Sequence, residues 1–147
     1  MMKWRPAALL LLLALPWIGC DETEGEGSGG LEPGSREPEI IEGFICGWIG
    51  DDGKPQGIDN DFIADDVVFI WLNWGNVEGN HRVRIIWLDP SDKVIAETSK
   101  SFDSQTGRWV TFFFIDTTSS APRGRWIAEV HIDDDFVRSY AFWIVEE

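Results

Sequence analysis

The stretch Pro122–Glu147, "PRGRWIAEVHIDDDFVRSYAFWIVEE", decides the fold of this 147-residue chain. In its first half, "RWIAEVHI", apolar residues occupy every second position, and polar or charged residues fill most positions between them. A period of two is typical of a β-strand with one buried face. Three consecutive aspartates then mark a turn, and a second apolar run follows. The stretch therefore predicts a hairpin of two strands, Arg125–Ile132 and Val137–Val145.

Five more candidate strands precede this hairpin and are separated by clusters of Gly, Asp, Asn, Ser and Pro: Ile40–Ile49, Val67–Trp74, Arg82–Asp89, Lys93–Thr98 and Arg108–Asp116. "VVFIWLNW" and "WVTFFFI" are apolar on both faces, which indicates central strands or strands with a covered outer face. No stretch repeats its apolar residues with helical period over three turns, although "DNDFIADD" is compatible with a short helical turn. Short strands rich in aromatic and β-branched residues predict an all-β, antiparallel β-sandwich.

The C-terminal stretch resembles the closing hairpin of many bacterial immunoglobulin-like domains. Those hairpins often carry Gly-x-Trp, an alternating strand, a short acidic turn and a last strand with Phe-x-Ile. In this chain Gly124, Trp126, Phe142 and Ile144 occupy these positions. "HRVRIIWLDPSDKVIAET" resembles the strand pair that precedes the hairpin. The resemblance implies an immunoglobulin-like sandwich of about seven strands, and it implies little about function.

The first residues, "MMKWRPAALLLLLALPWIGC", have the pattern of a secretory signal. Lys3 and Arg5 precede an apolar run that is shorter than the roughly 20 residues of a membrane-spanning helix. The last four residues resemble the lipobox of bacterial lipoproteins, in which the cysteine receives a diacylglyceryl group and fatty acids such as palmitate. The resemblance implies a signal peptide at 1–19 and lipid attachment at Cys20. An ordinary cleaved signal, or a buried helix that contains a cysteine, is the alternative.

Residues 20–39 are predicted to be a disordered linker between the lipidated cysteine and a domain at 40–147. "DETEGEGSGGLEPGSREPE" is acidic and rich in glycine, and such a composition cannot bury enough apolar surface to offset the entropy of ordering. Two or three acyl chains anchor a protein stably. The domain is therefore expected in the periplasm or outside the cell, held at a membrane of the bacterial cell envelope. Whether this is the inner or the outer membrane stays open.

The charge of the chain argues against nucleic acid as a partner. The 12 basic residues include Lys3 and Arg5 of the leader, so a chain that begins at Cys20 keeps 10 of them against 26 acidic residues, a net charge of −16. Binding to phosphate groups requires a basic surface. Most of the negative charge is expected to serve solubility.

Cys46 lies on a predicted strand and has no partner within the chain if Cys20 is lipidated. We expect it to be buried as a small apolar residue, with an intermolecular disulfide or a reactive thiol as alternatives. His81 and His131 are far apart in sequence and occupy polar positions, so the sequence predicts neither a zinc site nor a Cys–His pair.

The long acidic connection "DDGKPQGIDNDFIADD" holds candidate ligands for a metal, namely Asp59, Asp61, Asp65 and Asp66. Calcium binds six to eight oxygen atoms from such loops. The spacing is not that of an EF-hand, and acidic turns are ordinary on so anionic a chain. We therefore expect solvated turns and no cofactor, with calcium as the alternative.

Seven tryptophans follow the leader, more large rings than one sandwich core readily holds. Period two places Trp143 outward if Phe142 faces inward, and it places Trp71 and Trp74 on opposite faces. We name Trp74, Trp109 and Trp143 as a candidate binding surface, because exposed aromatic rings contact protein partners or stack on sugars. Cover by neighbouring side chains or loops is the alternative.

These observations predict a lipid-anchored envelope protein that is not an enzyme. The chain has no nucleophile elbow, phosphate-binding loop or dinucleotide fingerprint. The domain is expected to act as a protein-interaction or structural module whose partner is another envelope protein. Carbohydrate binding by the exposed tryptophans is the main alternative, with a polysaccharide as ligand, and a hydrolase built on the acidic loops is a weaker one.

Overall fold

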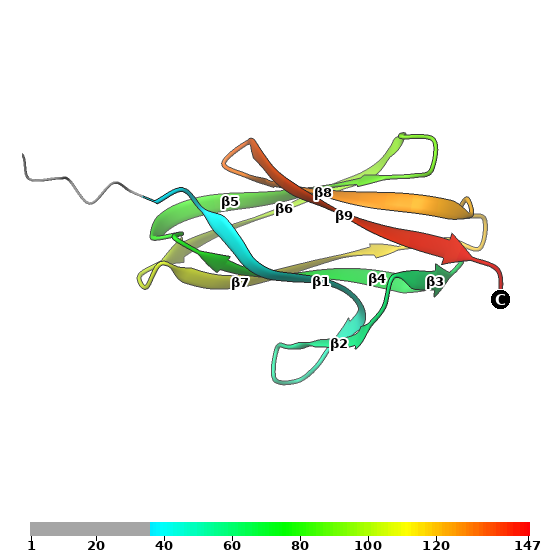
Figure 1. Cartoon of the computed structure of the whole chain (residues 1–147), viewed down its shortest axis with the longest axis horizontal. Coiled ribbons are helices and arrows are strands. Elements are labelled where there is room, and N and C mark those ends of the chain that lie inside the picture. Colours follow the sequence, from blue (N-terminus) through cyan, green and yellow to red (C-terminus); the bar gives the residue numbers. More distant parts are fainter. Residues whose placement is uncertain (1–35) are drawn as a thin grey trace, which may run out of the picture. The chain divides into compact units, whose positions relative to one another are not determined.

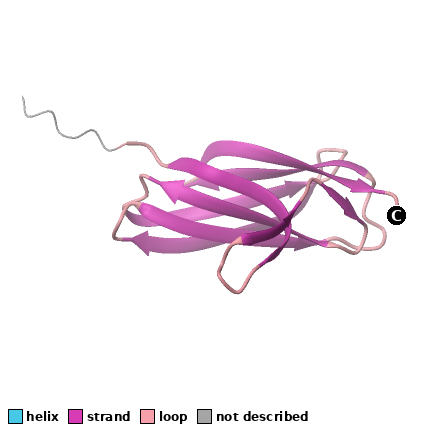
Figure 2. Cartoon of the chain, turned by 60° about the horizontal axis from the view of Figure 1, so that its bottom comes forward, coloured by secondary structure: helices cyan, strands magenta, loops and turns pink. Residues whose placement is uncertain are grey.

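The computed structural model of the chain describes residues 36–147, which form two β-sheets packed face to face (Figure 1, Figure 2). The strands are β1 (Glu39–Ile49), β2 (Pro55–Ile58), β3 (Asp61–Ile63), β4 (Val67–Gly75), β5 (Gly79–Leu88), β6 (Val94–Ser104), β7 (Arg108–Asp116), β8 (Gly124–Ile132) and β9 (Asp135–Val145). No helix occurs in this part of the chain. The predicted signal peptide, Cys20 and the linker as far as residue 35 lie outside the described residues.

The strands are divided between a four-stranded sheet, in the order β2-β1-β4-β7, and a five-stranded sheet, in the order β3-β9-β8-β5-β6. Neighbouring strands run antiparallel except β3 and β9, which are parallel. The predicted all-β sandwich is thereby confirmed. Its two layers are consistent with an immunoglobulin-like domain.

All seven predicted strands are present, and β6 differs most from its expected bounds. The segment "KSFDSQTG" was expected to be a loop, but β6 continues through it to Ser104 and pairs with β5 as far back as Gly79. Phe102 explains the extension, because its side chain is buried and its ring stacks on that of Trp109 at 5.3 Å. Burial of the Phe102 ring therefore keeps this segment in the extended conformation of a strand, although its other residues are typical of a loop.

Residues 59–66, whose sequence is compatible with a short helical turn, form no helix and instead contain β3 at Asp61–Ile63. This short strand lies beside the end of β9, where Phe62 is the partner of Ile144. The Phe62 ring is buried and meets the ring of Phe142 edge to face at 6.0 Å. Tertiary packing therefore decides the conformation of a segment that local sequence leaves ambiguous.

Phe142 of β9 is fully buried on the inner surface of the five-stranded sheet, among rings from three other strands. Its ring centroid is 6.2 Å from that of Trp87 on β5 and 6.0 Å from that of Trp126 on β8, in addition to the contact with Phe62. Aromatic pairs at these distances add to the free energy gained by burying their apolar area. One side chain of β9 thus contacts rings from β3, β8 and β5 of the same sheet.

Asp89 closes the hairpin between β5 and β6. Its Oδ1 accepts hydrogen bonds from the Ser91 hydroxyl at 2.7 Å and from the backbone N–H groups of Ser91 at 2.8 Å and Lys93 at 3.0 Å. These bonds favour the ionised carboxylate, and the Ser91 hydroxyl contributes most to lowering the pKa of Asp89 below its ordinary value.

Replacing Phe142 by Ala should lower the free energy of unfolding by about 3–5 kcal/mol, because the cavity would separate three packed rings. Chemical denaturation followed by tryptophan fluorescence measures this loss. Phe136→Ala is the matched control, since that ring is 59% exposed and its removal should change stability by less than about 0.5 kcal/mol. Equal effects of the two substitutions would contradict the central role of Phe142.

The lowered pKa of Asp89 makes its carboxylate stabilising at neutral pH, and this contribution is lost as the pH falls through the pKa of the folded state. From neutral pH to about pH 3, the stability of the wild type should therefore fall more steeply than that of Asp89→Asn. Urea denaturation at several pH values measures both slopes. Asp92→Asn, in the same turn, is the control and should retain the wild-type slope.

Candidate interaction surface

The edge strand β7 presents a row of large apolar side chains on the outer side of the four-stranded sheet. Val110, Phe112 and Phe114 are 44%, 37% and 51% exposed, whereas Thr111 and Phe113 between them are buried. This is the alternation expected of a strand with one face in the core. Here, however, the outward positions are as apolar as the inward ones.

The neighbouring strands continue this row across the sheet. Phe69 and Trp71 of β4 are the cross-strand partners of Phe114 and Phe112, and the Phe69 and Phe114 rings are 5.5 Å apart. Phe44 of β1 is paired with Trp71, and the two rings stack at 6.1 Å. We call this surface the aromatic face, defined by Phe44, Ile58, Phe69, Trp71, Val110, Phe112 and Phe114.

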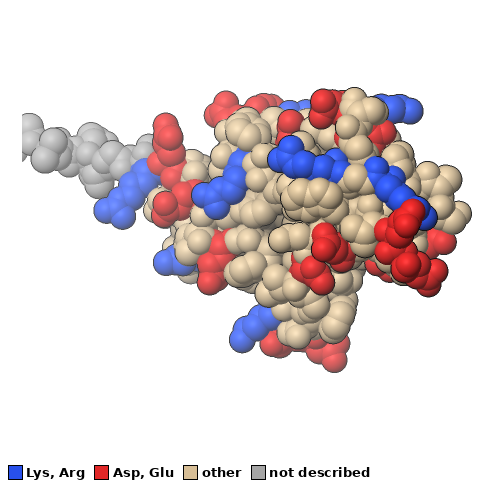
Figure 3. All heavy atoms as spheres, turned by 45° about the vertical axis from the view of Figure 1, so that its right-hand side comes forward, with Lys and Arg blue, Asp and Glu red and all other residues tan. Residues whose placement is uncertain are grey.

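Along β7 itself, charged residues occur only at the two ends of the row. Arg108 and Asp116 are the first and last residues of β7. The outer side of the five-stranded sheet differs, because Arg84 of β5 forms ion pairs there with Glu97 at 3.2 Å and with Asp134 at 3.9 Å. In Figure 3, one side of the domain carries interspersed acidic and basic residues around areas without charge.

Lys100 of β6 reaches from the five-stranded sheet to this edge. Its Nζ donates a hydrogen bond to the carbonyl oxygen of Phe112 at 2.6 Å and lies 4.3 Å from the centre of the Phe112 ring. Partial desolvation of the ammonium group lowers the pKa of Lys100, although the side chain as a whole is exposed. The side chain therefore covers one backbone acceptor on the free edge of β7.

The candidate binding residues Trp74, Trp109 and Trp143 do not form one surface. Trp74 is fully buried, and its Nε1 donates to Thr111 Oγ1 at 3.0 Å, so its assignment to an exposed surface was wrong. Trp109, 41% exposed, lies at the β7 edge. Trp143, 39% exposed, lies on the other sheet, facing outward as predicted from the inward position of Phe142.

Trp71 is the outward-facing member of the pair Trp71 and Trp74, but the turn between β1 and β2 covers it. Its Nε1 donates to the carbonyl oxygen of Gly53 at 2.8 Å, and its side chain is buried. Phe112 and Phe114 were not among the predicted site residues, although both stand on a strand that is apolar on both faces. The available signal was the uninterrupted run Phe112–Ile115, because period two must direct alternate members of such a run away from the core.

The four aspartates proposed as calcium ligands are not brought together. Asp59 Oδ1 accepts from the backbone N–H groups of Asn60 at 2.7 Å and Asp61 at 3.1 Å, and Asp66 Oδ2 accepts from that of Ile63 at 2.9 Å. These carboxylates hold turns of the backbone, as aspartates commonly do. Within residues 36–147, no group of three or more His, Cys, Asp or Glu side chains is placed to hold a metal ion.

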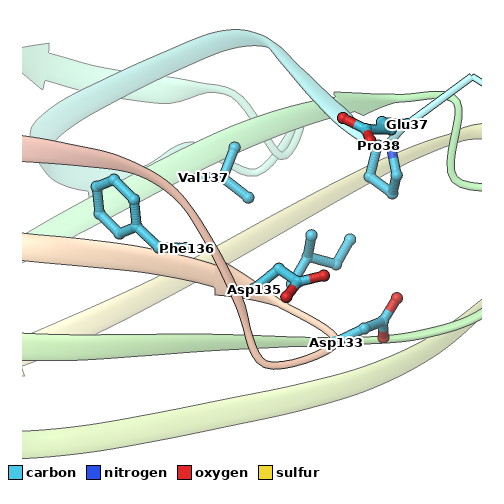
Figure 4. A pocket seen from close by; sticks show the side chains of 7 residues that line it. Glu37, Pro38, Asp133, Asp135, Phe136 and Val137 are labelled. Atoms are coloured by element: carbon cyan, nitrogen blue, oxygen red, sulfur yellow. The ribbon is translucent and has the colours of Figure 1, made fainter. Parts of the chain in front are cut away.

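A cavity of about 450 Å³ lies between the start of β1 and the turn from β8 to β9 (Figure 4). It is lined by Glu37, Pro38, Ile132, Asp133, Asp135, Phe136 and Val137. Asp133 is already engaged, since its Oδ2 lies 2.6 Å from His81 Nδ1 and its Oδ1 accepts from the Arg82 N–H at 2.9 Å. The lining consists of three carboxylate side chains, the backbone-engaged Asp133 among them, and of apolar side chains.

Cys46 is buried and forms no disulfide among the described residues. It stands between Ile58 of β2 and Phe69 of β4, its partners in the sheet. Burial raises the pKa of the thiol, which leaves less of the reactive thiolate at neutral pH. The side chain therefore behaves as a small apolar residue.

No model of a known protein family matches the chain, and no curated protein shows significant similarity to it. In the part of the chain that the structure describes, no helix has the length and apolar character needed to cross a membrane.

The buried thiol of Cys46 should react with iodoacetamide at neutral pH on the order of 100-fold more slowly in the folded chain than in urea, because thiolate formation and access are both suppressed. Mass spectrometry of the peptide that contains Cys46 measures the two rates and separates this residue from Cys20. Equal rates would show that the site is open in the folded protein.

Proposed function

We propose that this chain is a lipid-anchored bacterial envelope protein whose β-sandwich is a non-catalytic protein-interaction module. The aromatic face is the proposed contact surface, and another protein of the cell envelope is the proposed partner. The single observation that carries this proposal is the row of exposed rings on β7, continued by Phe69 on β4.

Exposed aromatic side chains in a continuous row support contact with a protein. Soluble monomers rarely expose large contiguous apolar patches, and patches of this kind commonly mark interfaces. Phe, Tyr and Trp are enriched at the centres of protein interfaces, and charged residues are depleted there. The aromatic face has the same composition, with Arg108 and Asp116 at its margins.

The lipid anchor is supported by the sequence of the leader. The small residue before Cys20 and the short apolar run behind two basic residues are typical of bacterial lipoproteins. With such an anchor, the domain would meet partners near a membrane surface. This arrangement favours a partner of the envelope over a freely diffusing one.

Carbohydrate binding is a weaker candidate. Sugar-binding surfaces stack a ligand on rings that share one platform, but Trp109 and Trp143 lie on different sheets, and Trp48 stands on the hairpin of β1 and β2. The continuous apolar surface belongs to phenylalanine side chains on a sheet face. Such a surface is suited to the buried centre of a protein interface.

Replacing both Phe112 and Phe114 by Ser should abolish capture of the partner, because the buried centre of the interface would become polar. The measurement is site-specific photo-crosslinking in the native bacterium from position 69, between the rings, followed by identification of the captured protein. The same double substitution should leave the fold intact, since both rings are exposed.

Ile95→Ser is the matched control, because Ile95 is an exposed apolar residue on β6 in the other sheet. It should leave capture unchanged. Cys20→Ala tests the anchor separately, since the domain should then leave the membrane fraction. Capture that survives the loss of both rings would contradict the contact surface, whereas membrane association without Cys20 would contradict only the anchor.

A further inference from the structure

The β7 edge has properties that distinguish it from the three other edge strands of the described sheets. Exposed strand edges invite pairing with another chain, and proteins usually protect them with short strands or charged residues. β2 and β3 have only 4 and 3 residues. β6 carries Glu97, Lys100 and Asp103 along its length, whereas β7 has no charge between its two end residues.

The free backbone groups of β7 belong to its even-numbered residues. The carbonyl oxygens of Arg108 and Phe112 accept from Ser104 Oγ at 2.8 Å and from Lys100 Nζ at 2.6 Å, both on β6 and therefore away from β4. Alternate residues of a strand direct their N–H and C=O groups to the same side. A further strand can therefore bind through Val110, Phe112 and Phe114.

The outward side chains of β7 form a sequence that is complementary to itself in the antiparallel direction. They are Arg108, Val110, Phe112, Phe114 and Asp116. When two copies of β7 pair antiparallel around Phe112, each Arg108 faces the other copy's Asp116 and each Val110 faces a Phe114. The two central Phe112 rings face one another. Opposite charges and apolar pairs in these cross-strand positions stabilise a sheet.

We propose that β7 is a self-association site, at which the edge strands of two copies of this chain pair antiparallel around Phe112. The pairing joins the two four-stranded sheets into one continuous sheet of eight strands. Neither Arg108 nor Asp116 forms an ion pair within residues 36–147, so both charges are available to a second copy. This inference is independent of the proposed function, because it requires neither lipid nor another protein.

Lys100 competes with the second copy for the carbonyl oxygen of Phe112. In the single chain its ammonium occupies this central acceptor, so the side chain must leave before the strands pair. Its exposed, flexible stem permits that movement. Lys100 therefore sets the strength of the association, and a residue without the ammonium group should favour the paired state.

The test uses a soluble chain that begins at residue 21, because Gly34–Glu147 is one compact unit that contains every strand. Sedimentation equilibrium at concentrations up to about 100 µM should show reversible dimers of the wild type. Lys100→Met should tighten the association several-fold. A wild-type chain that stays monomeric throughout this range overturns the proposal.

Charge reversal distinguishes the proposed register from other modes of association. Arg108→Asp and Asp116→Arg should each weaken self-association about ten-fold, because like charges then meet at both ends. The double variant should restore it, and an equimolar mixture of the two single variants should form mixed dimers. Arg125→Asp, a matched change on the other sheet, should leave association unchanged. Single reversals without effect, or a double variant without recovery, overturn the register.

Discussion

Burial of alternate residues of β4 determines which side chains of the four-stranded sheet face the solvent. Val68, Ile70, Leu72 and Trp74 lie in the core, so period two directs Phe69 and Trp71 outward. The antiparallel register with β7 then aligns Phe112 and Phe114 with these two residues. Core packing thus determines which residues of β4 and β7 face outward. The aromatic face exists because those outward residues are themselves apolar.

The fold could be predicted from sequence where one face of a strand is polar. In β8, Glu129 and His131 alternate with buried residues. The sequence therefore predicts both the strand and the face that it directs toward the core. β4 lacks this contrast, and the same uncertainty led to the wrong placement of Trp74. β3 was missed because three residues carry too little periodicity, and only the packing of Phe62 on Phe142 reveals it.

The candidate site was less predictable than the fold, because it depends on register. The distance between Phe69 and Phe114 follows from the pairing of β4 with β7. Along the chain these two strands are separated by β5 and β6, which both belong to the opposite sheet. The bond from Lys100 to the Phe112 carbonyl likewise joins two sheets. The high tryptophan content of the sequence favoured single large rings as the candidate site, whereas the continuous surface is made mainly of phenylalanines on adjacent strands.

The two ends of the sandwich also have a mechanical consequence. β1 begins at one end of the domain, and β9 finishes at the opposite end (Figure 1). A pulling force between these points acts along both strands, so the hydrogen bonds that join each strand to its neighbours are loaded in shear and resist together. A domain pulled between an anchor before β1 and a load at its far end would not unzip bond by bond.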